Sequence, residues 1–142
     1  MSTAQAETQI SSVRRPGPLR VLVVDDEPDT VITLLAILRD EGYEATGFSH
    51  PLEAVRGLRE FDPDVVIADI SMPIMSGWDF ARKVRQKMGD ARPMLVAISG
   101  VYQKSSDKLL ASMTGYEFFL TKPCDPAVIL MVVEKVRGDR EA

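Results

Sequence analysis

Polar residues that can carry chemistry follow four apolar runs of this 142-residue sequence, each at the point where a run ends. They are an acidic pair, a third acid, a small hydroxyl and an ammonium group: Asp25-Asp26, Asp69, Ser99 and Lys122. Three carboxylates packed closely repel one another, so such a cluster needs a cation. Mg2+ (or Mn2+) prefers oxygen ligands and is commonly held by carboxylates together with phosphate oxygens. The residue types therefore predict a metal site that handles a phosphoryl group.

The remaining groups suit the phosphoryl group itself. Lys122 offers a mobile positive charge, and Ser99 offers a hydroxyl donor for a phosphate oxygen. Phosphoryl transfer depends mainly on positioning and on charge neutralisation, so these groups can support it without a general base. Asp69 is then the predicted nucleophile.

Each of these residues also has a simpler interpretation when it is taken alone. Asp26 could be the N-cap of a helix, and Asp69 could be a turn residue. Ser99 could belong to an ordinary turn, and Lys122 could be a solvated surface charge. The joint interpretation is favoured because all of them follow successive predicted strands.

Those strands come from five alternations of a short apolar run with a longer amphipathic stretch, which is typical of βα units around a parallel sheet. The predicted strands cover residues 20–24, 44–48, 64–68, 94–98 and 117–120. The predicted helices cover residues 28–41, 51–60, 77–88, 104–114 and 125–137. The first, third and fourth strands are continuous apolar runs and suit the centre, whereas the second and fifth suit the edges. Because parallel strands end at one edge of a sheet, the polar groups should converge there.

Local signals mark where several helices begin. Pro28 suits the first turn of its helix. Ser49 before Pro51, and Asp125 before Pro126, are predicted to cap the second and last helices.

The composition limits the class of protein. The length fits one domain, with a disordered tail at 1–18, a folded domain at 19–138 and a short tail at 139–142. A net charge of −4 with no basic cluster argues against nucleic acid as a partner. Cys124 is the only cysteine and His50 the only histidine, so an internal disulfide is excluded and a zinc site is disfavoured. The longest apolar run is shorter than the roughly 20 residues of a membrane helix, and no secretory signal precedes it, so we expect a cytoplasmic protein.

Four motifs together resemble the receiver domains of response regulators, the phosphoacceptors of two-component signalling. They are VLVVDDEP at 21–28, VIADISMP at 66–73 followed by SGWDF, VAISG at 96–100 and FFLTKP at 118–123. The resemblance runs from Leu19 to about Arg137. It implies a doubly wound α/β fold, in which a five-stranded parallel sheet of order 2-1-3-4-5 carries five helices, as in flavodoxin-like receivers.

The resemblance also assigns the metal ligands. Asp26 would bind the metal directly, and Asp25 would act largely through water. Asp69 would be both a ligand and the phosphoacceptor. The backbone carbonyl of Ser71 would complete the protein's share of the coordination.

The same resemblance assigns a switch. Ser99 and Lys122 would bind the phosphoryl group, and the peptide between Lys122 and Pro123 would be cis. Ser99 and Phe119 would shift position together on phosphorylation, as a change of population. Many relatives have tyrosine in place of Phe119, so here the coupling would rest on packing alone. Val101 cannot hydrogen-bond a hydrolytic water, so we expect a persistent aspartyl phosphate.

The implied role is that of a single-domain response regulator, which is not an enzyme beyond its own phosphorylation and dephosphorylation. The phosphodonor would be a histidine kinase or a histidine phosphotransfer protein, and the output would be contact with a downstream protein target. Ile129, Val132, Val133 and Val136 form one core stripe of the last helix, which leaves Val128, Leu130 and Met131 as surplus apolar residues. They are either scattered surface residues or part of a partner-binding face, such as a homodimer through residues 104–114, 117–120 and 125–137.

Two other functions remain open on the same fold. An aspartate-nucleophile phosphatase usually has a second acid two residues after its nucleophile, and Ser71 occupies that position. A receiver-like interaction module with a vestigial acidic site is the other alternative. Addition of one phosphate from a small phosphodonor would distinguish an active receiver from a vestigial one.

Overall fold

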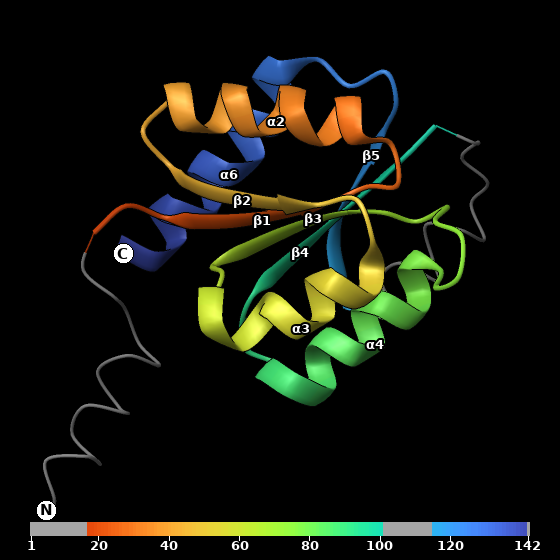
Figure 1. The fold of residues 1–142 in the computed structure, drawn as a ribbon. Coiled ribbons are helices and arrows are strands. Elements are labelled where there is room, and N and C mark those ends of the chain that lie inside the picture. Colours follow the sequence, from red (N-terminus) through yellow and green to blue (C-terminus); the bar gives the residue numbers. More distant parts are fainter. Residues whose placement is uncertain (1–16, 101–114, 142) are drawn as a thin grey trace, which may run out of the picture.

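The fold is seen in a computed structural model that describes residues 17–100 and 115–141 (Figure 1). Its strands are β1 (Arg20–Val24), β2 (Glu44–Phe48), β3 (Val65–Asp69), β4 (Met94–Ser99) and β5 (Tyr116–Thr121). Its helices are α2 (Pro28–Asp40), α3 (Pro51–Phe61), α4 (Gly77–Met88) and α6 (Pro126–Glu141). The predicted helix at 104–114, the predicted tail before residue 17 and Val101 lie outside the described residues.

All five strands are parallel and lie in the order β2-β1-β3-β4-β5, as predicted. The buried strand β3 lies at the centre, and β1 and β4 flank it with almost every residue buried. The strand order confirms the edge positions predicted for β2 and β5, and both strands are mostly half-buried.

Helices cover both faces of this sheet, with α2 and α6 on one side and α3 and α4 on the other (Figure 1). Alternate residues of each central strand therefore enter two separate cores. Leu22, Val66 and Leu95 join the cluster under α3 and α4, whereas Val23 and Val96 join the cluster under α2 and α6. This two-sided burial explains why the central strands are continuous apolar runs.

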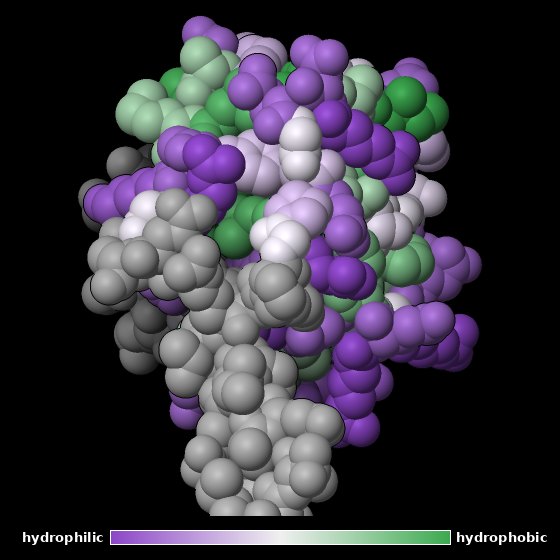
Figure 2. Space-filling model, turned by 90° about the vertical axis from the view of Figure 1, so that its left-hand side faces the viewer, coloured by the Kyte–Doolittle hydropathy of each residue, from purple (hydrophilic) through white to green (hydrophobic). Residues whose placement is uncertain are grey.

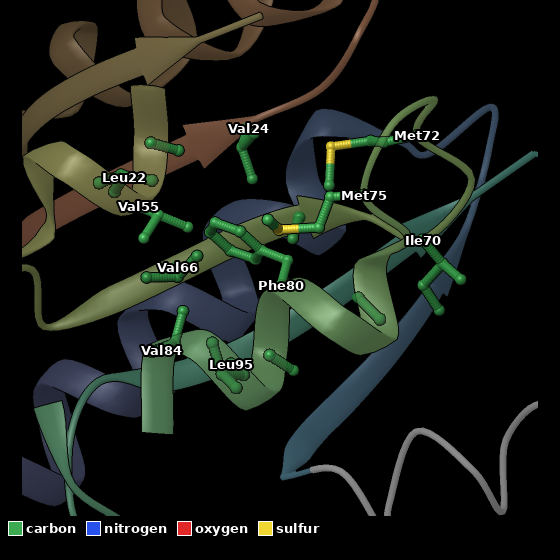
Figure 3. Close-up of a cluster of buried hydrophobic side chains, with 14 of the residues drawn as sticks. Leu22, Val24, Val55, Val66, Ile70, Met72, Met75, Phe80, Val84 and Leu95 are labelled. Carbon is green, nitrogen blue, oxygen red and sulfur yellow. The ribbon is translucent and has the colours of Figure 1, made fainter. Parts of the chain in front are cut away.

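The core under α3 and α4 is built around Phe80, which is fully buried (Figure 3). Val55 from α3 and Val66 from β3 are drawn beside its ring, and Met75 reaches the same cluster from the loop between β3 and α4. Burying a side chain of this size contributes roughly 1.5–3 kcal/mol. The loop that follows Asp69 is thus anchored in the core by its own side chains.

The helix boundaries differ from the prediction in detail. The cap predicted for the second helix is wrong, because the N-cap of α3 is His50 rather than Ser49. Nδ1 of His50 accepts a hydrogen bond from Leu52 N at 3.3 Å. The cap on the last helix is confirmed, since Asp125 Oδ1 accepts from Ala127 N at 2.9 Å. Helix α6 runs to Glu141, past its predicted end at 137.

The apolar stripe of α6 is confirmed, since Ile129, Val132, Val133 and Val136 are all buried. Of the surplus apolar residues, Val128 and Leu130 are half-buried. Met131 is 65% exposed.

The edge where the strands begin is tied together by ion pairs. Arg20 pairs with Glu44 at 3.0 Å, and Arg92 pairs with Asp62 at 2.7 Å. The buried Asp64 accepts from the backbone N–H of Arg20 at 2.9 Å. Figure 2 shows this face, where hydrophilic side chains predominate and apolar ones are scattered. The predicted site residues lie at the opposite edge, where the strands end.

Candidate metal and phosphoryl site

The strand register places the predicted site residues at one edge of the sheet. Asp69 is the last residue of β3 and pairs with Ile98, so it lies beside the end of β4 at Ser99. Ser99 pairs with Thr121, and Lys122 follows directly. Asp25 follows Val24, whose partner in β3 is Ala68. The convergence expected from the sequence is what the sheet produces.

The three acids form a compact group. Asp25, Asp26 and Asp69 each offer an oxygen atom, and these atoms all lie within 4.8 Å of one another. Asp25 is 2% exposed and Asp69 is 5% exposed, whereas Asp26 is more open to solvent. Buried carboxylates at this separation require positive charge. Among the described residues, this is the group of acids that could hold a metal ion.

Lys122 provides part of that charge from β5. Its Nζ lies 2.6 Å from Asp25 Oδ2 and 3.4 Å from Asp69 Oδ2. Burial of Lys122 lowers its pKa, but the hydrogen bonds and charges of the two acids outweigh burial and raise the pKa overall. The ammonium group is therefore charged at neutral pH. Because its Nζ contacts two buried acids and its side chain is only 21% exposed, the interpretation of Lys122 as a solvated surface charge is wrong.

Local backbone contacts fix the direction of each buried acid. Asp25 Oδ1 accepts from Glu27 N at 2.9 Å, and Asp69 Oδ1 accepts from Ser71 N at 3.0 Å. The second oxygen of each carboxylate thus faces Lys122. Asp69 ends β3, and its side chain accepts from the backbone two residues on, as in an Asx turn, so the turn and site interpretations are compatible.

The N-cap alternative for Asp26 is wrong. Helix α2 begins at Pro28 with Glu27 as its N-cap, and no side chain caps the helix. Asp26 instead belongs to the acid group, because it follows the end of β1 together with Asp25.

Ser99 is the last residue of β4, and Phe119 lies within the neighbouring strand β5. Ser99 is buried, and its backbone carbonyl accepts from Lys122 N at 3.0 Å. Phe119 is half-buried and packs against the core under α3 and α4. The peptide before Pro123 is cis, as the resemblance implied.

Glycines keep the backbone close to this group. A Cβ on Gly100 would lie 3.1 Å from Lys122 Cβ, so the lysine stem runs directly over the glycine. A Cβ on Gly77 would lie 2.9 Å from Asp69 O and 2.4 Å from Ile70 Cα. Neither glycine was among the predicted site residues, although both stand inside the quoted motifs.

Glu27 was also missed. Its Oε1 lies 3.9 Å from Lys122 Nζ, and it lines a cavity of about 520 Å³ beside Lys122, Pro123 and α2. Its place directly after the acidic pair is the signal that could have indicated it.

Residues 21–134 match the response regulator receiver domain family. The chain belongs to this family. The receiver domain is 30% identical over 117 residues to Protein PilH of Pseudomonas aeruginosa, covering 82% of this chain and 96% of PilH. It is 33% identical over 107 residues to the DNA-binding response regulator MtrA of Mycolicibacterium smegmatis, but spans only 45% of that relative.

Solved structures agree with this assignment. Chemotaxis protein CheY4 of Vibrio cholerae has a TM-score of 0.79 at 26% identity, with 84% of this chain and 99% of that chain covered. The beryllofluoride-activated NtrC4 receiver domain dimer has a TM-score of 0.77 at 28% identity, covering 85% and 98%. The receiver domain thus has the flavodoxin-like fold of these proteins. Among the described helices, none combines the length and hydropathy that crossing a membrane requires.

Proposed function

We propose that the receiver domain accepts a phosphoryl group on Asp69 from a phosphohistidine of a histidine kinase or phosphotransfer protein. An oxygen of Asp69 forms a bond to phosphorus as the bond from phosphorus to the donor imidazole nitrogen breaks, and the imidazole leaves with a proton from solvent. The product is an aspartyl phosphate. We expect the protein to catalyse only its own phosphorylation and dephosphorylation, so it would not be an enzyme in the usual sense.

The observation that carries this proposal is the grouping of three acids around one lysine. Asp25, Asp26 and Asp69, with the backbone carbonyl of Ser71, would hold Mg2+ or Mn2+, which supplies positive charge for the phosphoryl oxygens. The donor set fits such a cation because it consists of oxygens only, two of them on buried carboxylates.

Lys122 and Ser99 act on the phosphoryl group. The Lys122 ammonium already faces Asp69 Oδ2, so it is placed to neutralise charge on a group attached there. Ser99 ends the neighbouring strand beside Asp69, which supports a role in which its hydroxyl donates to another phosphoryl oxygen. Both side chains stabilise charge without taking up a proton.

The output is contact with another protein in the cytoplasm. Ser99 and Phe119 would change their populated positions on phosphorylation, and Phe119 transmits the change by packing because it has no hydroxyl. The exposed Met131 on α6 supports a contact face there, and the dimer of the similar NtrC4 receiver supports a second copy as its occupant.

Sedimentation over a range of concentrations, with and without beryllofluoride, tests this dimer. We expect association with the mimic that Met131→Glu weakens. Glu53→Gln, which changes an exposed acid of α3 on the opposite face of the sheet from α6, is the control. A monomer under both conditions would exclude the dimer.

Intact mass after incubation with acetyl phosphate and Mg2+ tests the phosphoacceptor role. We expect one added phosphate on the wild-type protein and none on Asp69→Asn. Asp79→Asn, an exposed acid at the start of α4, is the matched control and should behave like wild type. No added phosphate on the wild type would indicate a vestigial interaction module, and rapid multiple turnover of phosphate esters would indicate a phosphatase.

A further inference from the structure

A buried tyrosine hydroxyl holds the beginning of the helix that follows the acid loop. Tyr116, the first residue of β5, donates a 2.7 Å hydrogen bond from its hydroxyl to the backbone carbonyl of Gly77. Gly77 is the first residue of α4. The ring of Tyr116 also meets Trp78 edge to face, with centroids 6.1 Å apart. An edge strand and the start of α4 are thereby joined.

A bulge in β5 points Tyr116 in this direction. Leu95 pairs with Tyr116 and the next residue, Val96, pairs with Phe118, so the pairing skips Glu117. Regular alternation would place Tyr116 on the same face as Phe118. Instead, Tyr116 enters the core under α3 and α4, while Phe118 packs on the opposite side. Bulges commonly re-aim a side chain beside a functional site.

Gly77 is in turn packed against the backbone that carries Asp69. Its N–H donates to Ile70 O at 2.8 Å, and there is no room for a Cβ between it and Asp69 O. The same stretch continues to Ser71, whose N–H holds Asp69 Oδ1. A shift of Gly77 would therefore move the backbone on which both Asp69 and Ser71 depend.

The hydroxyl of Tyr116 remains a donor over the whole neutral range. Burial raises the pKa of Tyr116, the charge of Asp69 raises it further, and the charge of Arg85 acts in the opposite sense. The phenol therefore stays protonated, and its proton is committed to the carbonyl of Gly77.

We infer that Tyr116 is a positioning residue for the phosphoacceptor loop: its hydroxyl fixes Gly77, and Gly77 fixes Asp69 and Ser71. The inference rests on the proposed function and deepens it, because it assigns a task to a residue that never touches the metal or the phosphoryl group. Phe119 lacks a hydroxyl, and the bulge brings one onto the same face of β5 three residues earlier.

Tyr116→Phe tests the inference, because it removes only the hydroxyl. Tyr43→Phe is the matched control, since Tyr43 is also buried and donates a 2.6 Å hydrogen bond to Glu134 from a position at the other edge of the sheet. Three readouts are compared at a temperature well below unfolding. They are hydrogen exchange of the Gly77 amide without metal, the Mg2+ dissociation constant by calorimetry, and the rate of phosphorylation by acetyl phosphate.

We expect Tyr116→Phe to speed exchange of the Gly77 amide and to weaken Mg2+ binding about fivefold, the equivalent of one net hydrogen bond. Phosphorylation should slow to a similar extent, and Tyr43→Phe should match the wild type in all three. Equal behaviour of the two variants would overturn the inference. Faster exchange with unchanged Mg2+ affinity and rate would overturn it too, since Tyr116 would then only anchor the helix. If the wild type takes no phosphate, the proposed function fails, while exchange and Mg2+ binding still decide the positioning role.

Discussion

The ammonium nitrogen of Lys122 lies 2.6 Å from Asp25 Oδ2 but 3.4 Å from Asp69 Oδ2, so the lysine binds more closely to the acid that is not the proposed phosphoacceptor. Asp25 therefore shares the positive charge of Lys122 with Asp69. A metal cation that enters the site competes with this ammonium group for the carboxylates, and a phosphoryl group on Asp69 has to share the ammonium group with Asp25.

Removing the lysine should destabilise the metal-free protein and make it depend on Mg2+. Lys122→Met leaves the two buried acids without their cation, and breaking such a pair should cost about 2–3 kcal/mol, because part of the lysine remains in contact with water. Thermal unfolding with EDTA and with Mg2+ measures the effect. Mg2+ should raise the melting temperature of the variant more than that of the wild type. Lys83→Met, at an exposed position of α4, is the control, and an equal response of all three proteins would contradict the prediction.

Replacement of a helical glycine by alanine should lower the stability at Gly77 and raise it at Gly138. Gly77→Ala puts a methyl group 2.4 Å from Ile70 Cα, so the acid loop must shift, and we expect a loss of about 2 kcal/mol with slower phosphorylation. A Cβ on Gly138 meets nothing within 4 Å, so Gly138→Ala should stabilise α6 by roughly 0.5–1 kcal/mol. Urea denaturation measures both. An unchanged free energy of unfolding in Gly77→Ala would show that this contact does not hold the acid loop.

The free energy of unfolding should fall at alkaline pH because Tyr43 ionises less readily in the folded protein than in the unfolded chain. Burial, followed by the hydrogen bond to Glu134, raises the pKa of Tyr43 from 10.0 to about 12. Because the folded pKa lies above the unfolded one, this contribution is complete below about pH 10 and is lost as the pH rises toward about 12. We expect Tyr43 to account for a fall of about 1.4 kcal/mol per pH unit in that window. Urea denaturation at several pH values should show a shallower slope for Tyr43→Phe, and an unchanged slope would count against the assignment.

Ile74 should be replaceable by glycine with a gain in stability. It is 77% exposed in the loop after Asp69 and has a φ of 72°, a left-handed conformation that is costly for a β-branched side chain. Ile74→Gly should add about 1 kcal/mol to the free energy of unfolding. Ile32→Gly, at an exposed position inside α2, should do the reverse, because glycine disfavours a helix interior. The two variants moving in the same direction would be incompatible with this reasoning.

Much of the site could be predicted because it follows from the sheet. Asp69, Ser99 and Lys122 each stand at a strand end, and parallel strands bring those ends together whatever the detailed packing. The edge positions of β2 and β5 could also be predicted, from the mixed sequence of β2 and from the short aromatic sequence of β5. Local sequence patterns therefore predict the fold class and, through it, which side chains lie together in the site.

The features that could not be predicted from local sequence depend on contacts in the folded structure. Regular alternation predicts that Tyr116 and Phe118 share a face, and only the pairing of β5 with β4 introduces the bulge that separates them. The cap of α3 comes from His50 because its ring nitrogen, rather than the hydroxyl of Ser49, reaches the free N–H of Leu52. The closer bond of Lys122 to Asp25 likewise results from three-dimensional placement of side chains that are 97 residues apart.

The most direct measurement compares metal binding with phosphate incorporation at Asp69. Calorimetry gives the Mg2+ affinity, and intact mass gives the rate of phosphorylation by acetyl phosphate over the same range of Mg2+ concentrations. We predict that the rate saturates with the binding curve, that Asp26→Asn weakens both together, and that Asp69→Asn takes no phosphate. Incorporation that is independent of Mg2+, or that persists in Asp69→Asn, would contradict a shared metal and phosphoryl site.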